Sequence, residues 1–161
     1  MTAPIDAMLL WFELYSLQER YVAALDGDRL EDWAAMFTED CLYEIVPKEN
    51  EDMGLPMGLI RCDNQRMLRD RVLSLRHASI FDAHTYRHMT SGLTITSADA
   101  DSAAMSASYV VVQTRSNGES QIFQAGRYDD RVVRVNGQWL YASKRCIYDT
   151  SRVQTLLATP I

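Results

Sequence analysis

The sequence has few of the residues that bind metal clusters or form disulfides. Its 161 residues include three cysteines and three histidines. The cysteines, Cys41, Cys62 and Cys146, are far apart, and none is followed within three residues by a histidine. An iron–sulfur cluster with histidine ligands needs paired Cys–His motifs, and zinc knuckles or dithiol redox sites need closely spaced cysteines. We therefore expect no cluster and no disulfide, but three reduced, partly buried thiols.

The sequence also lacks the short motifs of several common enzyme classes. It contains no G-x-S-x-G elbow, phosphate-binding loop, dinucleotide-binding glycine motif or H-E-x-x-H. These motifs position nucleophiles, phosphates, cofactors and zinc. Hydrolase, kinase, dehydrogenase and metalloprotease functions therefore have no support in the sequence.

Positive charge is in the minority. The chain has 22 acidic and 16 basic residues, a formal net charge of -6, which disfavours binding to nucleic acid. The stretch 1–16, MTAPIDAMLLWFELYS, has no basic residue, and Asp6 and Glu13 interrupt its apolar run. It is therefore typical neither of a secretory signal nor of a membrane span. We expect a cytoplasmic protein with no nucleic-acid and no membrane partner.

What is present is the composition of an ordinary globular domain. Hydrophobic residues make up 47% of the chain and charged residues 24%, far from the composition of a disordered protein. A chain of this length fits one domain around one core. We expect residues 1–161 to form a single domain.

The first half of the chain has helical periodicity. Apolar residues at three- and four-residue steps predict a long helix over 4–25 and a shorter one over 30–38, separated by Asp-Gly-Asp. The strand-forming run 41–47 ends at a proline, and the polar segment after it predicts a surface loop. Asp63 is a candidate cap for a third helix.

The second half predicts a meander of strands. Asn117-Gly118 and Asn136-Gly137 are strong hairpin signals, because both residue types tolerate positive φ. The expected strands are 85–97, 103–115, 120–134 and 138–149. Helices first and a four- or five-stranded antiparallel sheet after them predict an α+β fold. Bulges at Gly92 and Gly126 would curve the sheet into a cone with a pocket.

Two of the three histidines lie in one segment, DAHTYRH, at 82–88. Two histidines and one carboxylate are the ligand set of many non-haem iron sites. His84 and His88 could share an ion on a helix, where residues i and i+4 are neighbours. On a strand, four residues span about 13 Å, too far for one ion. The β-forming residues around them predict a strand, which would place His84, Tyr86 and His88 on one face for hydrogen bonding or a subunit contact.

One acid/base hypothesis stays open. A cone could place His88 with Tyr43, Asp40 or Tyr15 around a small pocket for proton transfer. Aromatic residues at helical spacing, such as Trp11, Phe12 and Tyr15, are more often part of a core. No spacing among these residues requires catalysis.

Four separated blocks, in the same order, resemble the small (β) subunit of aromatic-ring-hydroxylating dioxygenases. They are MLRDRVLSLRHASIFDAHTYRHMTSG, RCIYDTSRVQTLLATPI, LEDWAAMFTEDCLYEIVPKEN and FQAGRYDDRVV. The resemblance implies a nuclear-transport-factor-2-like (NTF2-like) cone with N-terminal helices packed on a curved antiparallel sheet. The segment 49–59 is most similar to subunits that serve aromatic carboxylates such as salicylate, anthranilate or terephthalate.

The resemblance also implies a division of labour between two subunits. The Rieske [2Fe–2S] cluster and the mononuclear Fe(II) are expected in a large α subunit, with NAD(P)H used by a reductase. The small subunit would then hold no catalytic, cofactor-binding or metal-binding residue and would support an α3β3 hexamer, with self-association into a trimer. Tyr86, Arg87 and His88, and the tail ending at Ile161, are expected near subunit contacts.

Two other functions remain open for a chain with this predicted cone. One is a stand-alone lyase or isomerase that uses a pocket histidine with a tyrosine or acid. The other is a ligand-binding module.

Overall fold

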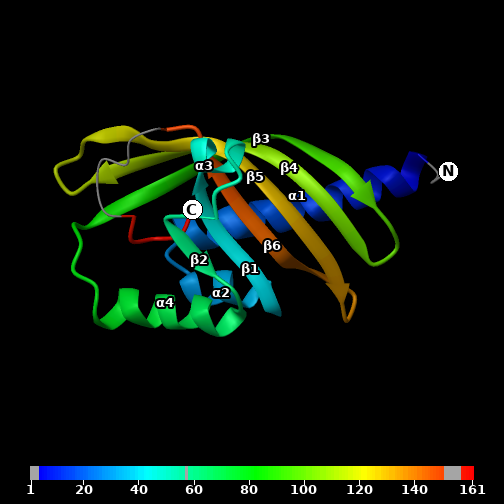
Figure 1. Cartoon of the computed structure of the whole chain (residues 1–161), viewed down its shortest axis with the longest axis horizontal. Coiled ribbons are helices and arrows are strands. Elements are labelled where there is room, and N and C mark those ends of the chain that lie inside the picture. The colour runs from blue at the N-terminus through cyan, green and yellow to red at the C-terminus, as the bar shows by residue number, and fades with distance from the viewer. Residues whose placement is uncertain (1–3, 57, 151–156) are drawn as a thin grey trace.

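Four helices and six strands make up the computed structural model, which describes residues 4–56, 58–150 and 157–161 (Figure 1). The helices are α1 (Pro4–Asp26), α2 (Leu30–Ala35), α3 (Lys48–Asp52) and α4 (Gln65–His77). The strands are β1 (Phe37–Pro47), β2 (Ile60–Cys62), β3 (His84–Ala98), β4 (Ser102–Arg115), β5 (Ser120–Val135) and β6 (Gln138–Tyr148). None of these helices is long and apolar enough to cross a membrane.

The strands form one sheet in the order β2-β1-β6-β5-β4-β3. The meander β3 to β6 is antiparallel, as expected, and two of its three hairpins turn at Asn117-Gly118 and Asn136-Gly137. The prediction of a wholly antiparallel sheet was wrong, because β1 lies parallel to β6. The meander alone does not reveal that pairing, since β1 is separated from β6 by most of the chain.

Three local predictions in the first half also need correction. β1 begins at Phe37 and not at residue 41, and the expected loop after it contains the five-residue helix α3. β2 pairs antiparallel with β1. It has only three residues, too few to show an alternating pattern of apolar and polar side chains, so the sequence did not predict it. Asn64, not Asp63, caps α4, because its side-chain oxygen accepts a hydrogen bond from the Met67 amide at 3.0 Å.

The two glycines expected to bend the sheet have different roles. Gly92 has a φ of 66° and lies where the register between β3 and β4 shifts, as predicted for a bulge. Gly126 lies in continuous register with β4 and β6. A Cβ atom there would be 2.1 Å from the carbonyl oxygen of Ile147. Glycine is therefore needed at 126 because another backbone approaches it closely.

The core lies between the helices and the inner face of the sheet. Six aromatic residues pack edge to face or tilted in it: Tyr21, Trp33, Phe37, Tyr43, Tyr128 and Tyr141. Such aromatic pairs contribute about 0.5–1.5 kcal/mol each beyond the area they bury. The aromatic core joins α1, α2, β1, β5 and β6 into one body.

A buried ion pair lies inside this aromatic core. Lys144 and Asp130 face each other across β6 and β5, with Nζ and Oδ2 2.8 Å apart and side chains 0% and 1% exposed. The ammonium also lies 3.7–4.7 Å from the ring centroids of Tyr21, Tyr128 and Tyr141. These rings and the carboxylate replace the water that the cation loses.

Replacing Gly126 by alanine should unfold the protein or cost about 3 kcal/mol or more, because the new methyl group overlaps the Ile147 carbonyl. The control is Gly118→Ala, which has open space but a φ of 85° and should cost about 1–2 kcal/mol. Urea unfolding of both variants measures the difference. Equal losses would show that the close approach at Gly126 is not what requires glycine.

The buried ion pair should make stability depend on pH. Burial raises the pKa of Asp130 from 3.8 to about 6, against the opposing effect of Lys144. Because the folded chain holds this proton more tightly than the unfolded chain, Asp130 stabilises the fold most at low pH, and that contribution is lost as the pH rises through about 6. The free energy of unfolding of the unmodified chain, minus that of Asp130→Asn, should fall by about 2 kcal/mol from pH ~4 to pH ~8. A difference that stays constant or rises would mean that Lys144 keeps the carboxylate ionised throughout.

Candidate functional site

From His84 to His88 the histidine segment forms the first part of β3, as predicted. His84, Tyr86 and His88 alternate along the strand and contact each other on the inner face. The ring centroids of His84 and Tyr86 are 4.8 Å apart, and those of Tyr86 and His88 are 6.1 Å apart. Tyr86 also stacks on Phe123 of β5 at 5.3 Å. The tyrosine ring therefore lies between the two imidazoles.

His88 pairs with Asp26, the last residue of α1. Its Nδ1 lies 2.6 Å from Oδ1 of Asp26, and its backbone N–H donates to Oδ2 at 3.0 Å. The His88 side chain is 0% exposed, and Nε2 has no hydrogen-bond partner among the described residues. A general base must present its free nitrogen to a substrate. Here that nitrogen is sealed inside the protein, so the pair holds α1 on the edge of the sheet.

His84 is held by the segment that precedes its strand. Its Nδ1 lies 2.7 Å from the carbonyl oxygen of Asp82, so the Asp82 carboxylate is not its partner there. His84 and His88 cannot reach one ion across the length of strand between them. In the part of the chain that the structure describes, no three histidine, cysteine, aspartate or glutamate side chains lie close enough to hold a metal ion. DAHTYRH thus does not fit a metal site of this chain.

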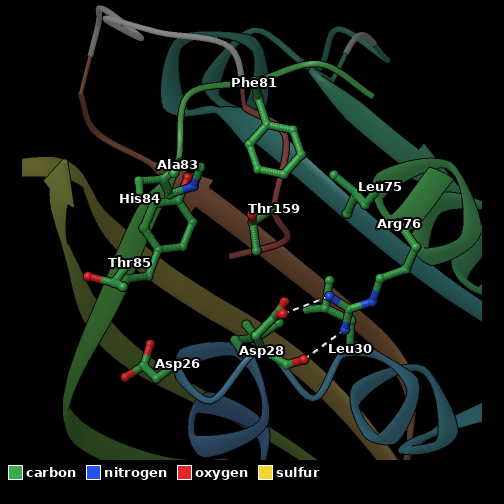
Figure 2. Close-up of a pocket in the computed structure, with 12 residues that line it drawn as sticks. Asp26, Asp28, Leu30, Leu75, Arg76, Phe81, Ala83, His84, Thr85 and Thr159 are labelled. Atoms are coloured by element: carbon green, nitrogen blue, oxygen red, sulfur yellow. Dashed lines mark hydrogen bonds and ion pairs between the residues drawn. The ribbon is translucent and has the colours of Figure 1, made fainter. Parts of the chain in front are cut away.

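A shallow pocket lies beside this segment, with a cavity volume of about 290 Å³ (Figure 2). Apolar side chains from α1, α2 and α4 line one part, and Phe81, His84 and Tyr86 line another. Arg76 is at its rim and is already paired with Asp28 at 2.7 Å and with Glu31 at 3.1 Å. Figure 2 shows the Arg76 guanidinium turned toward Asp28. An anionic ligand would have to displace these carboxylates.

The proposed proton-transfer residues do not meet. The Tyr43 hydroxyl lies in the core, where it donates to the Ile161 carbonyl at 3.1 Å and accepts from the Ile161 amide at 2.9 Å. Asp40 is exposed on β1. Tyr15 lies on the outer side of α1 and stacks on Trp11 at 5.1 Å. The acid that His88 contacts is Asp26, the last residue of α1, which belongs to no motif in the sequence.

The prediction that Trp11, Phe12 and Tyr15 are core residues was wrong. Their exposed fractions are 40%, 61% and 37%. The helix turns the opposite side toward the sheet, where Leu14, Leu17 and Tyr21 are buried. Both sides of this half of α1 are apolar, so periodicity alone could not choose the inner one.

The residues expected at subunit contacts differ in accessibility. Arg87 is exposed on β3. Tyr86 and the side chain of His88 are buried within their own chain, as is Ile161, whose carbonyl also accepts from the Tyr21 hydroxyl. Of the expected tail, residues 151–156 lie outside the described part of the chain. Arg87 is therefore the one accessible anchor among the four residues named.

The ion pair of Lys144 and Asp130 was missed from the sequence. Lys144 occupies an inward position of β6, two residues before the buried Cys146. Strand alternation could have flagged it, because a lysine facing a core needs a buried partner. Together with the tyrosines it fills the space where a cone could hold a ligand.

Comparison with known proteins gives consistent matches. A family model for the SnoaL-like domain matches residues 13–145, which agrees with the predicted α+β, NTF2-like cone. The anthranilate 1,2-dioxygenase small subunit of Burkholderia cepacia is 65% identical over 156 residues, 97% of each chain. The terephthalate 1,2-dioxygenase terminal oxygenase component subunit beta 2 of Comamonas sp is 32% identical over 154 residues, covering 96% of this chain and 100% of that one.

A solved structure is also similar over almost the whole length. It is the suggested beta subunit of an aromatic-ring-hydroxylating dioxygenase from Novosphingobium aromaticivorans. It superposes with a TM-score of 0.89 at 43% identity and covers 97% of this chain and 99% of that one.

Replacing Asp26 by alanine tests the role of its pair with His88. Asp26→Ala leaves the buried His88 amide and Nδ1 without their acceptor, which should lower the free energy of unfolding by about 2–4 kcal/mol. Glu31→Ala, which removes an exposed partner of Arg76, should cost less than about 1 kcal/mol. Denaturant unfolding compares the two. Similar small losses would mean that Asp26 does not hold α1 to the sheet.

Proposed function

The chain belongs to the family of small (β) subunits of aromatic-ring-hydroxylating dioxygenases, and we propose that it is the non-catalytic scaffold of a terminal oxygenase for an aromatic carboxylate. The observation that carries the proposal is the 65% identity to an anthranilate dioxygenase small subunit over 97% of both chains. Anthranilate and terephthalate, named for the two relatives above, are both benzene rings that bear carboxylate groups. The chain would work in the cytoplasm, where its cysteines stay reduced.

The interior of the cone supports a scaffold role. An enzyme pocket needs an accessible volume with a free acid or base facing it. Here the aromatic core and the pair of Lys144 and Asp130 occupy the inside of the fold, and the free nitrogen of His88 is sealed. Among residues 4–56, 58–150 and 157–161, no cluster of side chains offers a metal site either. The proposed partner is therefore a large α subunit that carries the Rieske [2Fe–2S] cluster and mononuclear Fe(II), in an α3β3 hexamer supplied with electrons by an NAD(P)H-dependent reductase.

One observation favours the second candidate, a stand-alone lyase or isomerase. His88 and Asp26 are arranged as an imidazole oriented by a carboxylate, a pairing that many general bases use. However, Nε2 of His88 is buried, so a substrate could not reach it. We therefore place this function second.

Co-expression with the large subunit tests the proposed function. The complex should purify with stoichiometric iron and hydroxylate an aromatic carboxylate when a reductase and NAD(P)H are supplied. The chain purified by itself should show no turnover and no stoichiometric iron by elemental analysis. Turnover of any substrate by the isolated chain, abolished by His88→Gln, would establish the second candidate instead.

A further inference from the structure

The two Asn-Gly hairpins differ in a way that affects their chemical stability. An asparagine followed by glycine can react without an enzyme, because glycine has no side chain to keep its backbone nitrogen away from the asparagine side chain. The glycine nitrogen attacks the side-chain carbonyl carbon, a C–N bond forms, and ammonia leaves. Water then opens the cyclic imide at either carbonyl, which gives aspartate or isoaspartate. Both Asn117-Gly118 and Asn136-Gly137 are exposed to the water that this reaction needs.

The turn at Asn117 is held by several hydrogen bonds. The Gly118 amide, which would be the nucleophile, donates to the carbonyl oxygen of Arg115 at 2.9 Å. The asparagine side chain is held at both of its polar atoms. Its Oδ1 accepts from the Glu119 amide at 3.0 Å, and its Nδ2 donates to Oε2 of the Glu119 carboxylate at 3.0 Å. Ring closure needs the amide and the side chain to turn toward each other, so these bonds must first break.

The turn at Asn136 has fewer restraints. Val135 pairs with Gln138, so the loop has only two residues. Both have positive φ, 49° for Asn136 and 78° for Gly137, as in a type I′ turn. No residue that the structure describes accepts a hydrogen bond from the Gly137 amide or bonds to the Asn136 side chain. The left-handed backbone must rotate before the ring can close, but that rotation breaks fewer hydrogen bonds than the same step at Asn117.

We propose that Asn136 is a modification site of this chain, where water converts asparagine to aspartate or isoaspartate faster than at Asn117. This inference does not depend on the proposed function. Isoaspartate continues the backbone through its side chain, so it adds an extra carbon atom to the chain within a two-residue turn. Figure 1 shows this turn at one end of the sheet, next to the arrowhead of β5.

The residues beside this turn hold α1. Arg134 and Trp139 both donate to Oε2 of Glu13 at 2.8 Å, and the guanidinium lies 4.4 Å from the centroid of the indole ring. Arg134 pairs with Trp139 directly behind the pair of Val135 and Gln138. An extra backbone atom in the turn disturbs this register, so isoaspartate should weaken the contact with α1. Ordinary aspartate, which also suits a type I′ turn, should leave it intact.

Timed incubation of the folded chain in neutral buffer tests the site. Peptide mapping by mass spectrometry follows each Asn-Gly pair separately, and an isoaspartate-specific methyltransferase with labelled S-adenosylmethionine measures the isoaspartate. Asn136 should convert roughly tenfold faster than Asn117, because fewer hydrogen bonds must open. In concentrated urea, where neither turn is folded, the two sites should convert at similar rates.

Two further comparisons test the cause and the consequence. Glu119→Ala removes the carboxylate that holds the Asn117 side chain and should speed conversion at Asn117 by roughly threefold or more, with no change at Asn136. The purified isoaspartate form should unfold at lower urea than the Asn136→Asp variant, which should match the unmodified chain.

Equal rates at the two sites in the folded chain, or a faster reaction at Asn117, would overturn the inference. It would also be overturned if Asn136 stayed intact in the folded chain over the time in which the unfolded chain is converted, because the folded turn would then protect it.

Discussion

The buried pair of Lys144 and Asp130 is the constraint on which most of the fold depends. A charge in a protein interior is costly unless another charge and polar or aromatic groups replace its water. Here the partner comes from the neighbouring strand, and the three tyrosines come from α1, β5 and β6. A one-residue slip of β6 against β5 would turn the lysine outward and leave the carboxylate unpaired. The pair thus fixes the strand register and the position of α1 together.

Because side chains fill the cone, the surface of the chain is what is left for its function. A cone of helices and curved sheet provides an interior that can hold either a ligand or side chains. In this chain the interior holds a closed cluster of aromatic rings around one ion pair, and the C-terminal carbonyl of Ile161 is bound there by Tyr21 and Tyr43. What is left for interaction is the surface. The proposed scaffold role, in which the small subunit contributes contact to the complex, fits that distribution of buried and exposed groups.

Helix α1 links the interior to the surface. Its inner side packs in the core, while Trp11 near one end and Asp26 at the other hydrogen-bond to the backbone of β3. β3 is a long edge strand, and an uncovered edge invites pairing with other chains. The helix protects part of that edge and leaves the apolar side chains of Met8, Phe12 and Tyr15 turned toward solvent. One element therefore closes the sheet and offers the apolar surface.

Sequence patterns predicted the long helices and the four strands of the meander, and blocks of residues indicated the family, but they missed α3 and β2. Local signals are strong where they depend on neighbouring residues: the Asn-Gly hairpins, the strand at DAHTYRH that rules out a shared ion between His84 and His88, and the bulge at Gly92. The sequence also identified several blocks of family residues in order. Tertiary structure alone decided the pairing of β1 with β6, the inner side of α1, and the partners of His88 and Lys144. These depend on residues that are far apart in the chain, such as Asp26 and His88, and no local pattern encodes which distant group will complete a buried charge or hydrogen bond.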